Sequence, residues 1–203
     1  MKTKDMQPQS PSEFSQGVSG QRHIIKPWKA VSLMLIALAV AAAGYGLTHV
    51  RRGFSALDTP SAIEKFTATT ARELAVPSGY RQLHNPIKPS TENIRAGMEH
   101  FADHCATCHS NDGGGQTLFG KGLYPKPPDL RAAGTQNKSD GELYYTIQNG
   151  VRLSAMPAFS EVHTVAQTWR LVLFIRHLPQ ITPEELNEMK ALNPKSVANP
   201  ANW

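Results

Sequence analysis

One short stretch constrains this chain more than any other: Cys105-Ala-Thr-Cys108-His109, which contains both cysteines of the 203-residue sequence. A C-x-x-C pair followed at once by histidine is typical of covalent attachment of a c-type haem. On a helix, residues at these offsets share one face, so two thiols and one imidazole can point at one flat macrocycle. The thiols would form thioethers with the porphyrin, and His109 would reach the iron as an axial ligand.

Two other functions of a C-x-x-C pair were weighed. A redox disulfide of this type is expected beside a βαβ pattern, and the sequence shows none. A zinc knuckle needs a second Cys or His pair further along the chain. His100 and His104 are the candidate pair, but they precede the cysteines on the same predicted helix. The pattern therefore favours haem attachment, with a haem-free zinc or thiol protein as the alternative.

The N-terminal part predicts a membrane anchor. Residues 1–29 are polar, and residues 30–50 contain no Lys, Arg, Asp or Glu. A helix of that length spans about 31 Å, close to the hydrocarbon thickness of a bilayer. Ala41-Ala42-Ala43 resembles a signal cleavage site, but the long polar stretch before the apolar run favours an uncleaved anchor. We expect a cytoplasmic tail at 1–29 and a transmembrane signal anchor at 30–50.

The charge distribution argues against a nucleic-acid partner. Residues 1–79 carry 9 Lys and Arg against 5 Asp and Glu, which accounts for most of the formal net charge of +5. No basic helix or basic–aromatic stripe lies in the remainder. The high isoelectric point therefore describes the leader more than the predicted domain.

Residues 51–89 are predicted to be a linker with one short amphipathic helix. Ser61 and Glu64 fit a capping box, and apolar residues recur at helical spacing up to Leu74. The segment from Pro77 to Ser90 is rich in proline and turn residues, so we expect it to be an extended approach to the domain.

Residues 90–180 are predicted to form a small all-α domain. Ser90 is a plausible cap for a helix that runs into Cys105, and a glycine cluster at 111–115 ends it. Residues 116–138 show no clean period and predict an ordered loop. Capping boxes begin at Ser139, Thr164 and Thr182. The last of these opens a C-terminal region, 181–203, with one short helix and a tail.

The second axial position decides between a carrier and a catalyst. Met98 precedes the attachment motif on the same helix and cannot reach the opposite haem face. Met189 lies in a terminal helix that we expect to be exposed. Met156 precedes Pro157, which disfavours helical geometry and stiffens the loop. Met156 is therefore the predicted sixth ligand, and methionine ligation raises the reduction potential.

Together these residues resemble the class I mono-haem cytochrome c family over residues 90–178. The resemblance aligns Gly97 and Phe101 with the family's N-terminal helix, and Leu171 and Phe174 with the helix that crosses it. Pro128-Asp129-Leu130 is similar to the family's Pro-Asn-Leu, where the proline carbonyl accepts the N–H of the ligand histidine. The loop 149–159 looks like that of bacterial membrane-anchored relatives that feed respiratory complexes.

The resemblance implies an all-α cytochrome c-like fold wrapped around one covalent haem c, preceded by one transmembrane helix. It implies an electron carrier, not an enzyme, with redox proteins of membrane respiratory complexes as donor and acceptor. The haem domain would lie in the periplasm, anchored in the bacterial inner membrane. The alternatives are a relay subunit of a larger oxidase, reductase or dehydrogenase, and a haem enzyme with an open sixth site.

The predicted site residues follow from both arguments. His109 and Met156 are the expected iron ligands, and the cofactor-binding residues are Cys105, Cys108, Pro128, Leu130 and Arg152. Basic residues are expected near the haem edge, where they would steer an acidic partner or pair with propionates. These are Lys121, Lys126, Arg131, Lys138 and Arg152.

Overall fold

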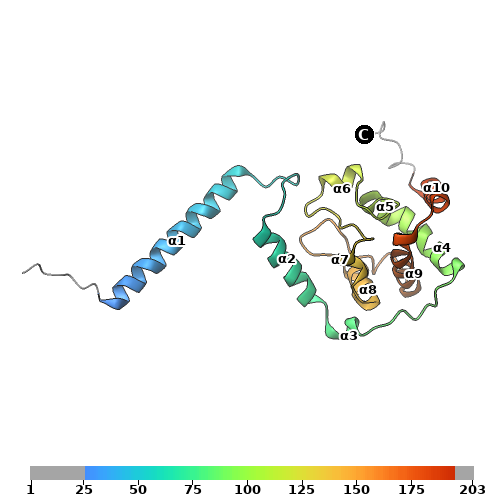
Figure 1. The fold of residues 1–203 in the computed structure, drawn as a ribbon, viewed down its shortest axis with the longest axis horizontal. Helices are drawn as coiled ribbons and strands as arrows, with labels where there is room; N and C mark the ends of the chain where they lie inside the picture. Colours follow the sequence, from blue (N-terminus) through green and yellow to red (C-terminus); the bar gives the residue numbers. More distant parts are fainter. Residues whose placement is uncertain (1–25, 195–203) are drawn as a thin grey trace, which may run out of the picture. The chain divides into compact units, whose positions relative to one another are not determined.

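The computed structural model describes residues 26–194, and every regular element in that range is helical (Figure 1). The all-α prediction is confirmed. The chain divides after Gly53 into two compact units. The predicted tails at both ends fall largely in residues 1–25 and 195–203, outside the described residues.

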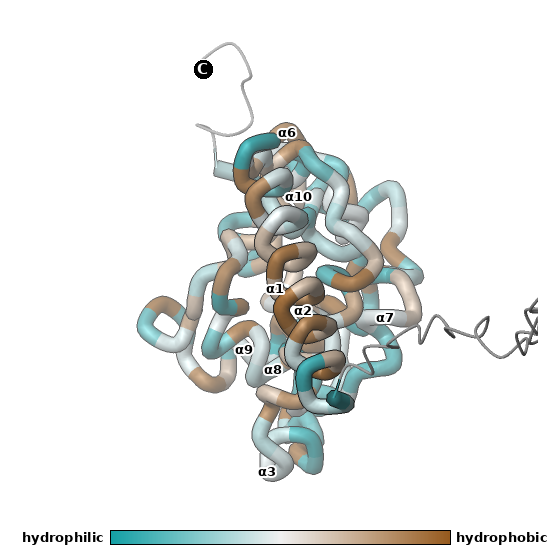
Figure 2. Tube along the Cα trace, turned by 90° about the vertical axis from the view of Figure 1, so that its left-hand side faces the viewer, coloured by the Kyte–Doolittle hydropathy of each residue, from teal (hydrophilic) through white to brown (hydrophobic). Residues whose placement is uncertain are grey.

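The first unit contains α1, Pro27–Arg52, which buries none of its side chains. Most of its residues are apolar, as the brown turns beside its label in Figure 2 show. Pro27 occupies its first turn, where a missing N–H costs nothing. The helix is long and apolar enough to cross a membrane, and the predicted span 30–50 lies within it. It is a candidate membrane anchor.

The second unit begins with α2, Ala62–Ala75, whose start agrees with the sequence. The Ser61 hydroxyl accepts a hydrogen bond from the Glu64 backbone N–H. The reciprocal half of the expected capping box is not formed, because the Glu64 carboxylate accepts the Tyr124 hydroxyl instead. The apolar side chains Ile63, Phe66 and Leu74 are exposed.

A short helix, α3 (Ser78–Arg81), lies in the segment that we predicted to be an extended approach. The expectation was wrong for these four residues, because tertiary contact holds this turn in place, whereas residues 82–90 have no regular element. A Cβ built on Gly141 would lie 1.7 Å from the Tyr80 carbonyl oxygen, so α3 packs directly on the backbone of α8 (Asp140–Asn149). The Tyr80 ring also meets Tyr145 edge-on, with centroids 4.9 Å apart.

The attachment motif lies at the end of a continuous helical segment that is α-helical at both ends and π-helical in the middle. It consists of α4 (Thr91–His100), a π-helical turn (Phe101–Cys105) and α5 (Ala106–His109). In the π turn, the Ala106 N–H donates to the carbonyl of Phe101, five residues earlier. Ser90 caps the start, as predicted. Turns of this kind are frequent at functional sites.

Helix α9, Val165–His177, crosses α4 at Gly97. A Cβ at Gly97 would lie 2.2 Å from the Arg170 carbonyl oxygen, so the two backbones touch there. One turn further along, where the π-helical turn begins, the Phe101 ring packs on the Phe174 ring with centroids 5.1 Å apart. The predicted crossing of these two helices is confirmed.

Residues 116–138 are not a plain loop, which corrects the prediction. They contain α6 (Leu118–Gly122) and α7 (Ala133–Gln136), both too short to leave a periodic pattern in the sequence. A distant residue holds the end of α7. The Arg176 guanidinium on α9 donates to the carbonyls of Gln136 (2.6 Å) and Lys138 and to the Asp140 carboxylate (2.9 Å).

Capping boxes at Ser139, Thr164 and Thr182 are all formed, so the starts of α8, α9 and α10 (Pro183–Leu192) are confirmed. The expectation that Met189 is exposed was wrong: its exposed fraction is 0%, because α10 packs back on the core. The other members of the buried apolar core are Met98, Phe101, Ala102, Ala106, Leu130, Leu143, Ile147, Trp169, Leu171, Val172, Phe174, Ile175 and Leu178.

Candidate functional site

The two cysteines lie in the second half of the attachment helix, form no disulfide with each other, and are both half-buried. Burial, together with the neighbouring Cys108, raises the pKa of Cys105 to about 12. Burial also raises the pKa of Cys108. A thiol–disulfide enzyme needs the opposite, a thiol with a lowered pKa. Before haem is attached, the raised pKa values therefore favour protonated thiols at neutral pH, which argues against the redox-disulfide function.

The His109 ring is neutral at physiological pH. Burial lowers its pKa, and an interaction with the backbone of Pro128 opposes that shift. Proline has no N–H, so its carbonyl oxygen is the group that can act on the ring. Nδ1 of His109 is nevertheless buried without a hydrogen bond of normal geometry among the described residues. A buried, neutral imidazole in this position fits the role of an axial haem ligand.

A glycine-rich turn packs main chain around the end of the attachment helix. The Gly115 N–H donates to the His109 carbonyl at 2.7 Å. A Cβ at Gly115 would lie 2.9 Å from the Pro127 carbonyl oxygen, and one at Gly120 would lie 2.6 Å from that of Cys108. These positions have no room for a side chain. The turn therefore brings the Pro-Pro-Asp-Leu segment close to the attachment motif.

Gly120 and Thr117 were not predicted as part of this site. The Thr117 hydroxyl caps α6 by accepting the Gly120 N–H, and it also donates to the Cys108 carbonyl at 3.3 Å. The sequence offers one weak signal for this arrangement, a threonine three residues before a glycine.

The segment after Pro128 is held in place by contacts of its own residues, Asp129 and Leu130. Leu130 is buried in the core, and its N–H donates to the Gly113 carbonyl at 2.9 Å. Asp129 stands where the family has asparagine, and its carboxylate pairs with Arg131 at 2.9 Å. The hydrogen bond from Arg131 lowers the pKa of Asp129. The same guanidinium pairs with Asp112 at 2.7 Å, so Arg131 joins the two loops.

The Met156 loop closes on itself by main-chain contacts. Gly150 has φ +65°, and a Cβ there would lie 2.7 Å from the Met156 carbonyl oxygen. The Val151 N–H donates to that carbonyl at 3.1 Å. The Met156 side chain is half-buried and packs against the same core as Cys105. Arg152 lies in this loop and is exposed.

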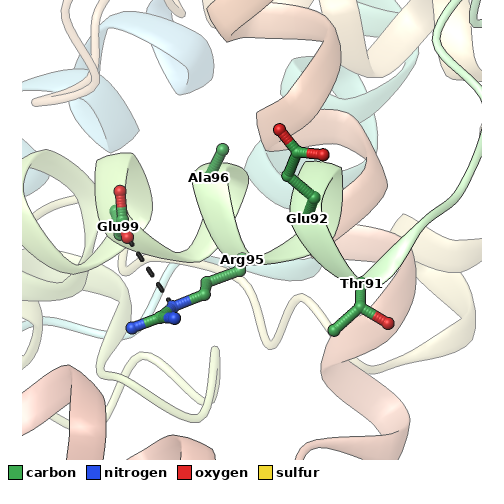
Figure 3. Close-up of a pocket in the computed structure, with 5 residues that line it drawn as sticks. All are labelled: Thr91, Glu92, Arg95, Ala96 and Glu99. Carbon is green, nitrogen blue, oxygen red and sulfur yellow. Dashed lines mark ion pairs between the residues drawn. The ribbon is translucent and has the colours of Figure 1, made fainter.

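A surface depression on α4 is a poor candidate for the site. Its lining residues, Thr91, Glu92, Arg95, Ala96 and Glu99, all lie along this one helix (Figure 3). Arg95 pairs with Glu99 at 3.8 Å across it. The lining contains no cysteine, histidine or methionine, so nothing there can attach or ligate haem.

An all-α domain in which one helix carries Cys105, Cys108 and His109 in the C-x-x-C-H pattern has the features of a c-type cytochrome. Residues 92–175 match the family model described as cytochrome C oxidase, cbb3-type, subunit III. This segment is a cytochrome c domain. Such a domain binds its haem c covalently.

No curated protein matches the chain. A solved structure, the Kuenenia stuttgartiensis reducing HAO-like protein complex Kustc0457/Kustc0458, has a chain with 22% sequence identity and a TM-score of 0.42. The alignment covers 46% of this chain and 46% of that one, so the protein spans about half the length of this relative.

Proposed function

We propose that the protein is a membrane-tethered electron carrier with a single haem c ligated by His109 and Met156. The observation that carries the proposal is the shared core. Cys105 on the attachment helix and Met156, 51 residues later in the sequence, both pack against it. Two segments that meet on one apolar core can enclose one prosthetic group between them.

When bound, the haem supplies one-electron chemistry, with iron alternating between Fe(III) and Fe(II). The chain's own residues supply the rest. Cys105 and Cys108 hold the group covalently, and Leu130 contributes apolar surface beside it. With haem bound, the Pro128 carbonyl would accept the Nδ1–H of His109 and so fix the orientation and tautomer of the ring. Arg152, which is exposed, is proposed to meet a propionate or the partner protein.

The test is a redox difference spectrum of detergent-extracted, full-length protein. Cys105→Ala should abolish covalently held haem. Met156→Ala should leave haem attached but remove the long-wavelength absorption band of the Fe–S bond. Met189→Leu is the matched control, because Met189 is a buried methionine in the same core. A wild type without haem refutes the proposal, and loss of the band in Met189→Leu refutes the choice of Met156.

A relay subunit of a larger oxidase, reductase or dehydrogenase is the second candidate function. The match to an oxidase subunit favours it, because that family is named for a complex. Gentle detergent extraction followed by size-exclusion chromatography separates the two. A tethered carrier elutes alone, whereas a relay subunit elutes with partner chains. A haem enzyme with an open sixth site would instead bind carbon monoxide rapidly when reduced, and we expect the native protein not to.

We infer that α1 anchors the protein in the bacterial inner membrane and that the haem domain faces the periplasm. Helix α1 supports the anchor by its length and apolar character. The periplasmic side follows from the chemistry, since the resemblance implies haem attachment outside the cytoplasm. Protease treatment of spheroplasts should degrade the cytochrome domain, and protection of the domain would contradict this orientation.

A further inference from the structure

Three histidines that the electron-transfer function does not use meet beside the haem-attachment motif. His100 and His104 come from the helical segment before Cys105, and His163 immediately precedes the cap of α9. Each offers one ring nitrogen, and these three atoms all lie within 4.8 Å of one another. The rings are tilted relative to one another, with interplanar angles of 37°, 54° and 90°. The three rings therefore do not stack on one another.

His163 is the side chain that most needs an explanation. Only 4% of it is exposed, and neither ring nitrogen has a hydrogen-bond partner among the described residues. A buried histidine normally satisfies its nitrogens with a protein group or water. Burial lowers the pKa of His163 to about 4, and His104 and His100 add to that shift. The ring is therefore neutral at physiological pH, as a metal ligand must be.

The surroundings of the other two histidines suit ligation as well. Nδ1 of His104 lies 3.4 Å from the Asp103 carboxylate and 3.4 Å from the His100 carbonyl oxygen. Both neighbours are acceptors, so they favour a proton on Nδ1 and leave Nε2 free. A carboxylate behind a ligating histidine is the usual second-shell arrangement in zinc sites. The pKa of His100 is lowered by burial and by His104, so this ring is also held neutral.

The distances between the three ring nitrogens are close to those that a tetrahedral metal site requires. Two nitrogens bound to one tetrahedral Zn²⁺ at about 2.0–2.1 Å are about 3.3 Å apart. The three nitrogens would thus approach one another by about 1.5 Å at most from the 4.8 Å limit. His104 is exposed, so its side chain can make that adjustment.

We propose that His100, His104 and His163 form a mononuclear site for a divalent transition metal, with water in the fourth position. Imidazole suits Zn²⁺ and Cu²⁺, and the open position follows from three protein ligands. The bound ion joins the attachment helix to the segment after Met156. Phe159 connects the site to the Met156 loop, because its ring stacks on His163 with centroids 5.0 Å apart. The site is separate from the haem ligands and does not depend on the electron-transfer proposal.

The experiment is a Zn²⁺ titration of chelator-treated, full-length ferric holoprotein in detergent, followed by calorimetry. Wild type should bind one equivalent that His104→Gln removes. Because loss of a second-shell partner alone costs about 10–100-fold in affinity, we expect at least about a 100-fold loss for His104→Gln and about tenfold for Asp103→Asn. His84→Gln is the matched control, since His84 is an exposed histidine outside the cluster, and its affinity should equal that of wild type.

Ligand identity is tested separately with Cu²⁺ and electron paramagnetic resonance. The wild-type spectrum should show imidazole nitrogens at one copper ion, and this signal should be lost in His104→Gln and His163→Gln. His104 is exposed, so the first variant remains folded even if the second does not. The haem absorption spectrum should stay constant throughout, which separates this site from the haem. Absence of the one-equivalent site, or an equal loss in His84→Gln, would overturn the proposal.

Discussion

The contact between α4 and α9 at Gly97 makes a quantitative prediction for Gly97→Ala. The added Cβ would lie 2.2 Å from the Arg170 carbonyl oxygen and 3.0 Å from the Phe174 Cβ, whereas ordinary contacts are 3.4–4 Å. The nearest of these atoms is main chain, so α9 itself must move by about an ångström. Overpacking of this kind costs about 1–3 kcal/mol, and a backbone clash belongs at the upper end.

The gain in helix propensity from glycine to alanine offsets about 1 kcal/mol of that cost. The expected net loss is therefore about 2 kcal/mol. At about 2–4 °C per kcal/mol for a unit of about 150 residues, the size of the second unit, the Tm should fall by about 4–8 °C. Thermal unfolding of the holoprotein, followed by far-UV circular dichroism, measures it.

Gly134→Ala is the matched control, because Gly134 lies in α7 and a Cβ there meets nothing within 4 Å. It should leave stability unchanged or raise it by up to about 1 kcal/mol. If both alanine variants have the same Tm, the close approach of α4 and α9 does not limit stability and the reasoning is wrong.

Three further predictions concern the Met156 loop, an ion pair and a cap. Gly150→Ala introduces a Cβ at φ +65°, 2.6 Å from the Pro157 carbonyl carbon. This clash should displace the Met156 loop and weaken the long-wavelength haem band. A band of wild-type strength would contradict the prediction. Burial alone would raise the pKa of Glu185, but the Thr182 N–H and His177 outweigh it and lower the pKa below 4.5. Ionised Glu185 therefore stabilises the fold above pH 4.5, and this contribution is lost as the pH falls through the folded pKa. Denaturant titrations should therefore give wild type and Glu185→Gln the same free energy of unfolding in acid. A difference in this free energy that stays constant with pH would refute the prediction. Thr164→Ala removes the cap of α9 and should cost about 1 kcal/mol in urea unfolding; no change in midpoint would show that the cap is not needed.

Features set by neighbouring residues were predictable from the sequence. The caps at Ser139, Thr164 and Thr182 depend on a hydroxyl and a carboxylate or amide three residues apart, and all three were predicted correctly. The attachment motif is similarly local. The α4–α9 crossing was also predicted, because Gly97 and Phe101 carry the resemblance to a known family.

Features set by distant contacts were missed. Helices α3 and α7 are each four residues long, and their positions depend on Gly141 and Arg176, which are remote in sequence. The burial of Met189 depends on how α10 folds back, which its own polar sequence does not indicate. His163 was missed because it meets His100 and His104 only in the folded chain.

The glycine-rich turn after His109 has a consequence for how such a domain can diversify. Its contacts with the attachment helix are made by main-chain atoms, as between Gly115 and His109. The neighbouring side chains Gln116 and Leu118 point into solvent, and 74% of Leu118 is exposed. Substitutions at these two positions can therefore change the surface offered to other proteins without moving the histidine. Recognition can evolve here while the geometry of the ligand stays fixed.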